Sequence, residues 1–470
     1  MSQDLLQANA ATPGDDLEDI ALGEDYALTS EYVEMVVDAA DRGDGMRLRD
    51  LLSALHPADV ADLMGFLSQA HRSEVLPWVP PALLAETLPE LDDGIREDIL
   101  EEVTPGALAE ALQELDSDDA AALVEDLDAE RRREVLAAMP ESERAVIESS
   151  LAYGEDTAGR LMQREVMAAP QFWTVGQTID HMRAQGDDLP ELFFDIYVVD
   201  PGFKPVGGVP VSHLLRARRE VALSELMEPI NEVAVDLDQE EVAYVFEKYH
   251  LISAPVVDQS GRLVGQITVD DIVNIIQEEN QEDILALAGV SDAGRDAGVM
   301  DVVRSRFPWL AVNLGTALIA STVIALYRAE IEQLVALAVL MPIVASIGGN
   351  AGTQALAVAV RALSNRELNA SNTLRVVSRE LMVGLLNGVG VALLLGGATW
   401  LWFREPALSL TIGLAVIINL MAAALAGTLA PLLLDRMGRD PAVSSPVFVT
   451  WATDTIGFFS FLALAGLILL

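Results

Sequence analysis

The 470-residue sequence predicts a multidomain protein: a cytosolic α-superhelical domain, a pair of α/β modules, and an α-helical membrane domain of five spans. Charge is the first observation behind this prediction. Residues 300–470 hold 9 acids and 10 arginines, whereas the preceding residues hold 64 acids and 19 bases. The second is that apolar runs long enough to cross a bilayer begin only after residue 306. The third is that short helical patterns change to strand patterns near residue 153.

The composition narrows the classes of function. The absence of cysteine excludes thiol catalysis, disulfides and zinc–thiolate sites. A net charge of −44 repels nucleic acid and attracts cations, so we expect no nucleic-acid partner. An acidic surface that only maintains solubility is the alternative, and the presence of just 2 lysines among 29 bases also fits it. Residues 1–20 are acidic and polar, unlike a signal peptide, so we expect the soluble half in the cytoplasm.

The first part of the chain is expected to be helical. Residues 1–30 read as a disordered acidic tail. From residue 31 to 152, short amphipathic helices recur about every 12 residues, with cap signals such as Thr104 followed by Pro105. Serial short helices predict an acidic superhelix. It shows no catalytic constellation, and His56 and His71 are expected at the surface or in caps.

Residues 153–279 follow a mixed α/β pattern that occurs twice. The weaker copy has strands at 195–200 and 206–211 and a helix from residue 214; the clearer copy has a helix at 240–249, a strand at 254–258, and a turn, strand and helix start within 261–272. The tandem copies resemble a pair of CBS modules. In that family a Ser/Thr-x-x-Asp pair can hold a nucleotide ribose, and Thr268 and Asp271 match it, which implies ATP as a candidate ligand. A helix cap explains Thr268 equally well.

Five charge-poor apolar runs follow, each of about 20 residues or more and able to cross roughly 30 Å of hydrocarbon as a helix. They are 308–327, 334–360, 381–403, 407–434 and 447–470. Eight arginines flank these runs on one side: Arg304, Arg306, Arg361, Arg366, Arg375, Arg379, Arg436 and Arg439. The other side has only Arg328 and Arg404. This bias predicts a multi-pass protein of the cytoplasmic membrane with a cytosolic N-terminus and an extracytosolic C-terminus.

The last run contains a single formal charge, Asp454. An ionised carboxylate at bilayer depth is costly and usually faces a bundle interior or a watered pathway. Thr450 and Gly457 share its face of the predicted helix. The runs contain no lysine or arginine to neutralise the acid, so we expect a mobile cation as its counter-charge. An acid paired with a hydroxyl or an asparagine is the alternative.

The second run contains Pro342 and the segment Gly348-Gly349-Asn350. Glycine pairs favour a break or kink, and backbone released at this depth must face protein or water. Gly348, Gly349 and Asn350 are therefore expected to line an ion pathway. Close helix packing through small residues with polar side chains as glue is the alternative.

Residues 280–306 are expected to form a connecting helix between the α/β pair and the membrane domain, residues 307–470. Glu279, Glu282 and Asp283 fall on one side of this helix. Like charges at this spacing repel unless a cation lies among them. A solvated acidic face is the alternative.

The order of these parts, with Gly-Gly-Asn-x-Gly-Thr-Gln in the second run and Thr-x-x-x-Asp-x-x-Gly-Phe in the fifth, resembles the MgtE family of bacterial magnesium channels over residues 31–470. The resemblance implies a homodimer whose pore follows the two-fold axis. It also implies that Asp454 binds hydrated Mg²⁺, assisted by the carbonyl of Thr450. By motif position, the regulatory magnesium ligands are Asp238, Glu240, Asp271, Glu279, Glu282 and Asp283. His250 stands where the family often has a further acid.

We therefore expect a magnesium channel or transporter for uptake that is closed by cytosolic Mg²⁺. Magnesium gives up its water reluctantly, which suits a pathway with one carboxylate per subunit. One alternative is a proton- or sodium-coupled divalent cation transporter with Asp454 as the relay. Another is a CBS nucleotide sensor that transports nothing. An enzyme is not expected, because the spans contain no histidine, cysteine or paired acids.

Overall fold

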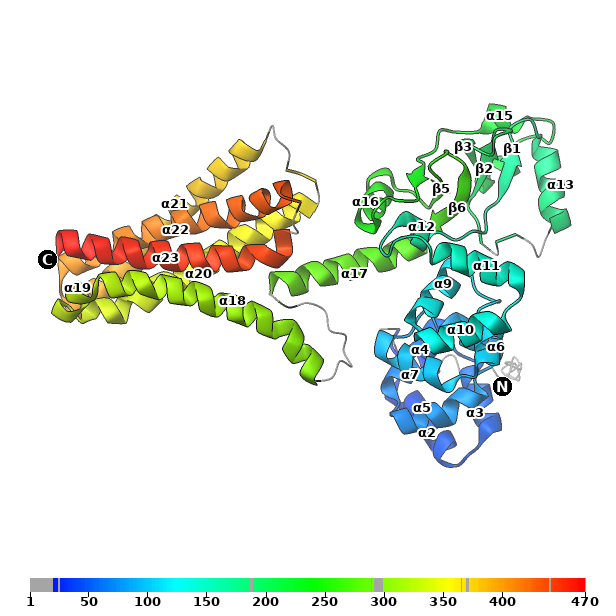
Figure 1. Cartoon of the computed structure of the whole chain (residues 1–470), viewed down its shortest axis with the longest axis horizontal. Coiled ribbons are helices and arrows are strands. Elements are labelled where there is room, and N and C mark those ends of the chain that lie inside the picture. Colours follow the sequence, from blue (N-terminus) through cyan, green and yellow to red (C-terminus); the bar gives the residue numbers. More distant parts are fainter. Residues whose placement is uncertain are drawn as a thin grey trace, which may run out of the picture. The chain divides into compact units, whose positions relative to one another are not determined.

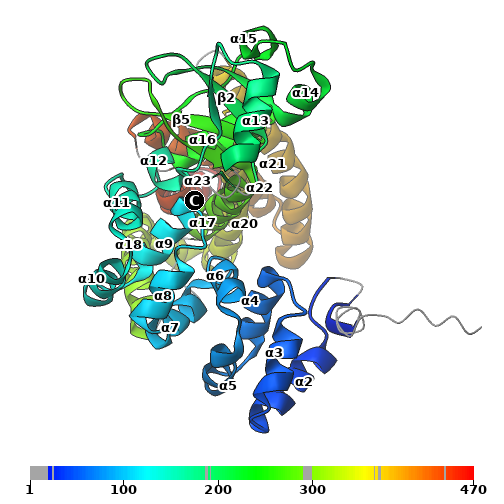
Figure 2. The ribbon, with the colours of Figure 1, turned by 90° about the vertical axis from the view of Figure 1, so that its right-hand side faces the viewer.

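The computed structural model describes residues 20–23, 26–185, 189–190, 192–288, 290, 299–364, 366–368, 372–438 and 441–469. The chain folds into two compact units, Met1–Ile276 and Gln277–Leu470. Figure 1 shows the whole chain and Figure 2 a second view of it.

Short helices build the first half of the first unit, as expected for a superhelix. They are α2 (Ser30–Asp41), α3 (Gly45–Leu52), α4 (Pro57–Phe66), α5 (Gln69–Val75), α6 (Pro81–Thr87), α7 (Asp93–Glu102), α8 (Pro105–Ala111), α9 (Ser117–Asp126), α10 (Ala129–Ala138) and α11 (Glu141–Ser150). Thr104 caps α8 by accepting a hydrogen bond from Ala107 N at 3.4 Å, with Pro105 in the first turn. The predicted cap role of His56 is confirmed, because its Nδ1 accepts from Ala58 N at 3.3 Å.

The expected disordered tail, residues 1–30, is too long, because residues 20–23 and 26–30 belong to the folded first unit. Residues 1–19, 24 and 25 lie outside the described residues. Ala21, however, is buried in the superhelix core, and Thr29 Oγ1 donates to Ile20 O at 2.9 Å. A short bridge pairs Leu22 with Leu28. Apolar burial and a threonine cap thus order a segment whose acidic composition suggested disorder.

The second half of the first unit contains two three-stranded sheets, which confirms the tandem α/β pattern. One sheet has the order β1 (Ala168–Pro170), β2 (Asp195–Val199) and β3 (Pro205–Pro210); the other has the order β4 (Val233–Ala234), β5 (Ser253–Val257) and β6 (Leu263–Thr268). In each sheet the first pair is parallel and the second antiparallel. Helices α13 (Val175–Gln185), α14 (Val211–Arg216) and α16 (Gln239–Tyr249) accompany them. Tyr197 joins the two modules by donating its hydroxyl to Ser253 Oγ at 2.9 Å.

Helix α17 (Val269–Leu287) starts directly after β6 and includes the acidic residues Glu279, Glu282 and Asp283. The expected connecting helix, 280–306, is therefore divided differently in the structure. Its first part continues α17 without a break, and residues 299–306 already belong to α18 (Val299–Leu326). Residues 291–298 lie outside the described residues.

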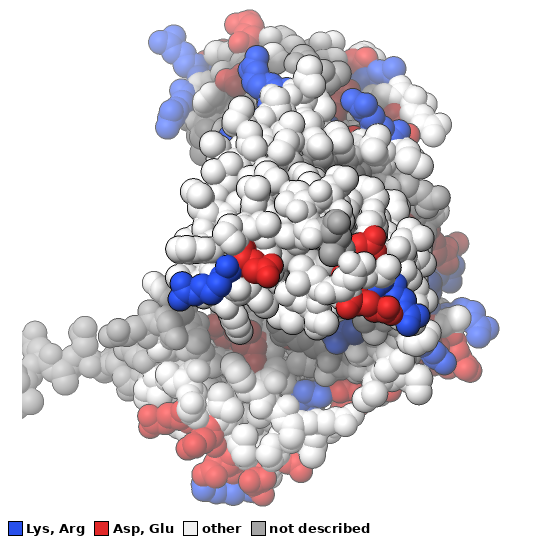
Figure 3. Space-filling model, turned by 90° about the vertical axis from the view of Figure 1, so that its left-hand side faces the viewer, with Lys and Arg blue, Asp and Glu red and all other residues white. Residues whose placement is uncertain are grey.

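The second unit is a helical bundle. After α18 come α19 (Arg328–Gln333), α20 (Ala336–Ser364), α21 (Thr373–Phe403), α22 (Pro406–Arg436) and α23 (Pro441–Ile468). Helix α18 and all of these except α19 are long and apolar enough to cross a membrane, giving five candidate spans among the described residues. Helix α22 packs against α20, α21 and α23. Figure 3 shows the end of the bundle near the C-terminus, where only a few charged side chains lie among uncharged ones.

The predicted break in the second span is wrong, because α20 runs without interruption from Ala336 to Ser364. Its glycines instead permit close packing, the alternative considered above. A Cβ at Gly348 would overlap Asn419 of α22, and one at Gly352 would lie 2.5 Å from Val449 Cγ1 of α23. The fully buried Asn419 supplies the polar glue, because its Nδ2 donates to Val344 O at 2.9 Å.

Candidate ion pathway and acidic cluster

Asp454 lies in the middle of α23 and is partly exposed. It is the only charged residue between Pro441 and Ile468. No described residue makes a hydrogen bond or ion pair with its carboxylate. One turn earlier, Thr450 is exposed and its hydroxyl donates to Pro446 O at 3.0 Å, while its carbonyl accepts from Thr453 Oγ1 at 3.1 Å. An acid without a protein counter-charge is therefore accessible from outside this single chain.

The contacts between α20 and α23 place Asn350 and Asp454 at the same depth in the bundle. Asn419 lies against both Gly348 of α20 and Gly457 of α23. Four residues further along α20, Gly352 meets Val449 and Thr453. The two helices are thus antiparallel at this point, and the level between the two contacts contains Asn350 and Asp454.

The predicted residues of the second span divide between two faces of α20. Gly348 is buried against Asn419, so its part in the pathway is confined to backbone and packing. Asn350 is exposed, and no atom lies within 4 Å of the place where a Cβ of Gly349 would stand. No role for Asn419 was predicted from the sequence, and the structure places it between α20 and α23. A lone amide in an apolar run is the signal that could have assigned it one.

A second acidic site lies within the first unit, where α9 approaches the start of α17. Asp116, Asp118 and Asp119 come from the α9 end, and Asp270 and Asp271 come from α17. Burial raises the pKa of Asp118 well above its usual range, and the negative charges of Asp271, Asp119 and Asp116 raise it further. Burial and neighbouring carboxylates likewise raise the pKa of Asp119 to about 6 and that of Asp271 to about 7.

One atom of this cluster is unusual. Oδ1 of Asp118 is buried and has no hydrogen-bond partner among the described residues. A buried acceptor without a partner is costly, and a carboxylate surrounded by other carboxylates is costlier still. A cation would relieve both costs. Asp118 and Asp119 were missed in the sequence, because their partners on α17 lie about 150 positions away along the chain.

The predicted regulatory acids lie in three places. Asp271 belongs to the α9–α17 cluster. Asp238 caps α16, where its Oδ1 accepts from Glu240 N at 3.0 Å, and both side chains are exposed. On α17, Glu279 and Asp283 are partly buried one turn apart, whereas Glu282 is exposed; Asp283 Oδ2 accepts from Ser364 Oγ at 3.3 Å. Among the described residues, no three histidine, aspartate or glutamate side chains are arranged as direct metal ligands.

Thr268 and Asp271 bond to each other at the junction of β6 and α17. Thr268 Oγ1 donates to Asp271 Oδ2 at 3.0 Å, a bond between two side chains, whereas in a helix cap the hydroxyl accepts from a backbone N–H of the first turn. His250 ends α16 in the left-handed region, with φ of 54°. His250 therefore forms the turn in the backbone that ends α16.

Together these features define a class of protein: a polytopic membrane protein that joins an acidic soluble half to a helical bundle, in which Asp454 has no partner among the residues that the structure describes. Family models match three stretches of the chain. Residues 55–156 match the MgtE intracellular N domain, residues 223–278 match the CBS domain, and residues 341–464 match MgtE, described as a divalent cation transporter.

The relatives extend this match to most of the chain. It is 34% identical over 330 residues to "Magnesium transporter MgtE" of Thermus thermophilus, covering 69% of this chain and 73% of the relative. It is 32% identical to the protein of that name from Enterococcus faecalis, over 66% of this chain and 68% of the relative. The chain belongs to the MgtE family. It is thus a multi-pass membrane transporter, and the expectation that it is not an enzyme is confirmed.

Among solved structures, the chain is similar to the cytosolic domain of the Mg²⁺ channel MgtE in complex with ATP. The identity is 33%, the TM-score 0.49, and the match covers 52% of this chain and 99% of that one. The soluble part of a magnesium transporter follows, with 27% identity, a TM-score of 0.48, and coverage of 53% and 98%.

Proposed function

We propose that the protein carries Mg²⁺ into the cell through a pathway formed by α20 and α23. The observation that carries this proposal is Asp454, a lone membrane carboxylate without a partner among the described residues. The names of the relatives point to magnesium as the cargo. Mg²⁺ keeps several waters when it is held by few carboxylates, so one acid per chain suits a hydrated ion.

The pathway residues are Asp454, the carbonyl of Thr450, Asn350, and the backbone at Gly348 and Gly349. Asn350 and Thr450 are exposed on the single chain. Such polar side chains are costly against lipid tails, so a second copy is expected to enclose them. The functional unit is therefore a homodimer, with its N-terminus in the cytosol according to the arginine distribution.

Flux measurements in liposomes test this proposal. Purified protein should admit Mg²⁺, and the flux should not depend on imposed proton or sodium gradients. A flux that follows either gradient would favour the coupled transporter. No flux at all from well-folded protein would favour a nucleotide sensor.

Gating is the second part of the proposal: cytosolic Mg²⁺ binds the acidic soluble parts and closes the pathway. The α9–α17 cluster supports it, because Asp118, Asp119 and Asp271 repel one another without a cation. A hydrated Mg²⁺ can bridge such carboxylates through its waters, which does not require three direct ligands. Asp238, Glu240, Glu279, Glu282 and Asp283 complete the proposed regulatory set.

Proton release tests magnesium binding at the cluster. Carboxyls with raised pKa values lose protons when a cation binds. Calorimetry of the full chain at pH 6.5 in two buffers of different ionisation enthalpy should show proton release on adding Mg²⁺, and the double variant Asp118→Asn, Asp119→Asn should release fewer protons.

Adenine nucleotide binding at Thr268 and Asp271 is also proposed. Thr268→Ala should weaken ATP binding measured by calorimetry, and unchanged ATP affinity would contradict the proposed nucleotide site.

A further inference from the structure

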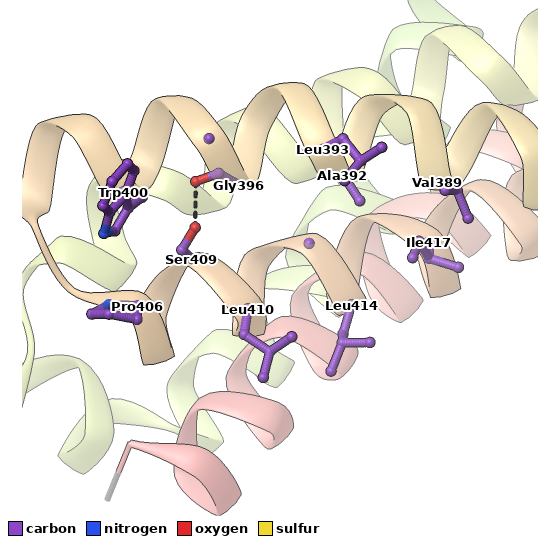
Figure 4. Close-up of a pocket in the computed structure, with 12 residues that line it drawn as sticks. Val389, Ala392, Leu393, Gly396, Trp400, Pro406, Ser409, Leu410, Leu414 and Ile417 are labelled. Atoms are coloured by element: carbon purple, nitrogen blue, oxygen red, sulfur yellow. Dashed lines mark hydrogen bonds between the residues drawn. The ribbon is translucent and has the colours of Figure 1, made fainter.

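The membrane unit has an apolar groove between α21 and α22 that the transport pathway does not use. The groove is open and has a volume of about 530 Å³. Figure 4 shows its lining side chains, which come from both helices. Its walls are aliphatic, including Val389, Leu393, Leu410, Leu414 and Ile417, and Trp400 and Pro406 stand at one end.

Small residues explain why the groove is open. Gly396 lies against Ser409, whose hydroxyl donates to the Gly396 carbonyl and fixes the two helices at the floor. Gly413 of α22 also packs closely against Ala392 of α21. Gly397 also lines the groove, but no atom lies within 4 Å of the place where its Cβ would stand. A hollow therefore remains above a close helix contact.

The position of the groove determines what surrounds it. Both of its walls belong to candidate membrane spans, Thr373–Phe403 and Pro406–Arg436. Leu393 and Leu410 are exposed on the single chain, at 74% and 57%. The hydrocarbon tails of phospholipids fill the space around such side chains in a bilayer. A groove of this volume is within the range of ligand pockets, which is about 300–1,000 Å³.

The Trp400 end of the groove carries the features of a membrane–water boundary. Trp400 and Trp402 are both exposed, as in the aromatic belts where amphipathic rings meet headgroups. The turn between the two helices holds Arg404, which is exposed and adopts φ of 59°. Arg404 makes no ion pair with any residue that the structure describes. A guanidinium without a partner beside an apolar groove suits a phosphate group.

We propose that this groove binds one bilayer phospholipid, with an acyl chain between α21 and α22 and its phosphate at Arg404. The apolar walls select the tail, and Arg404, in the turn that joins the two walls, selects the anionic group. A side chain of a second copy is the competing occupant. The charge argument favours the lipid, because the groove and Arg404 together fit a molecule with one long apolar part and one anionic end. This inference does not depend on the ion that the protein carries.

Lipid titration of the full-length protein in mild detergent tests the proposal, with phosphatidylglycerol as the probe and native mass spectrometry as the readout. Gly397→Leu should fill the groove and weaken retention of one lipid per chain. Gly390→Leu is the matched control, since Gly390 is also on α21, also has open space at its Cβ, and does not line the groove. Arg404→Gln should weaken binding about tenfold through loss of a charge-assisted hydrogen bond. Arg328→Gln, at an arginine already paired with Glu332, should not.

Equal lipid retention in Gly397→Leu and Gly390→Leu would overturn the proposal. So would a Gly397→Leu protein that becomes monomeric with its lipid retained, because the groove would then hold a second copy. A measurement on the wild type covers the case in which a variant fails to fold. A phospholipid with a photoreactive acyl chain should label residues 389–417, and labelling confined to other helices would contradict the assignment.

Discussion

At the scale of single residues, the second membrane span shows how two adjacent glycines can have different tasks. Gly348 faces the buried amide of Asn419, and a Cβ there would overlap Asn419 Nδ2. No atom lies within 4 Å of the place where a Cβ of Gly349 would stand. The same amide also meets Gly457 of α23, where an added Cβ would be 2.7 Å from Nδ2. Asn419 thus connects the two helices that carry the proposed pathway.

We expect Gly348→Ala to destabilise the bundle and Gly349→Ala to leave it as stable as the wild type or more stable. Overpacking of a tight core costs about 1–3 kcal/mol. Replacing a free helical glycine with alanine favours the helix by up to about 1 kcal/mol. Thermal unfolding of both variants in one detergent, followed by circular dichroism, measures the difference. Equal unfolding midpoints for the two variants would show that Asn419 can move away from residue 348 without loss of stability.

At the scale of elements, the contact between α9 and the start of α17 depends on pH. The folded-state pKa values of Asp119 and Asp271, about 6 and about 7, lie above the ordinary 3.8. Between these values the folded state binds more protons than the unfolded state, so stability falls as pH rises. The stability that Asp119 and Asp271 contribute is fully present only below about pH 4 and is lost above about pH 7.

In magnesium-free buffer, the first unfolding transition of the full chain should therefore move to lower temperature between pH 5 and pH 8. Asp118→Asn removes a buried charge from the cluster and should flatten this slope and raise the midpoint at pH 8. Asp128→Asn is a control that should change the unfolding midpoint in the opposite direction. Backbone hydrogen bonds from Arg131 and Glu130 lower the pKa of Asp128, so its loss should destabilise at neutral pH. If the unfolding temperature of Asp118→Asn changes with pH as in the wild type, the pH dependence does not come from the α9–α17 cluster.

Elements were predictable from sequence where local pattern decides the structure. The tandem α/β modules, the cap at Thr104 and the five spans follow from periodicity and turn chemistry. The continuous α20 does not, because the effect of Gly348 and Gly352 depends on Asn419 and Val449, which are distant in sequence. Asp118 was missed for the same reason. Its raised pKa comes from burial and from Asp271, neither of which the local sequence around α9 reveals.

At the scale of the whole molecule, the proposal couples an acidic soluble half to a membrane pathway. A ligand shifts such an equilibrium only if it binds one state more tightly than the other. Mg²⁺ held among the acids of a closed state would do this. The opposite effect is also physical, because neutralising acids removes the repulsion that favours opening. Bound contacts are short-range, whereas the diffuse field is screened beyond about 10 Å at ordinary salt, so we expect the contacts to dominate.

Neutralising Glu279, Glu282 and Asp283 together, as Gln, Gln and Asn, should therefore yield a transporter that internal Mg²⁺ inhibits less. Flux into liposomes is measured against a series of internal magnesium concentrations. Neutralising three exposed acids of the superhelix, Glu97, Glu101 and Glu130, controls for net charge. An inhibition curve unchanged from the wild type would mean that the α17 acids form a solvated face.

The central claim concerns Asp454, and one measurement tests it most directly: Mg²⁺ flux through Asp454→Asn in liposomes. The variant keeps the shape of the side chain and removes the charge. Because the carboxylate has no partner among the described residues, its loss should not weaken the fold and can strengthen it. The account predicts a protein that inserts and assembles as the wild type does, with flux abolished or strongly reduced. Flux equal to the wild type would contradict it.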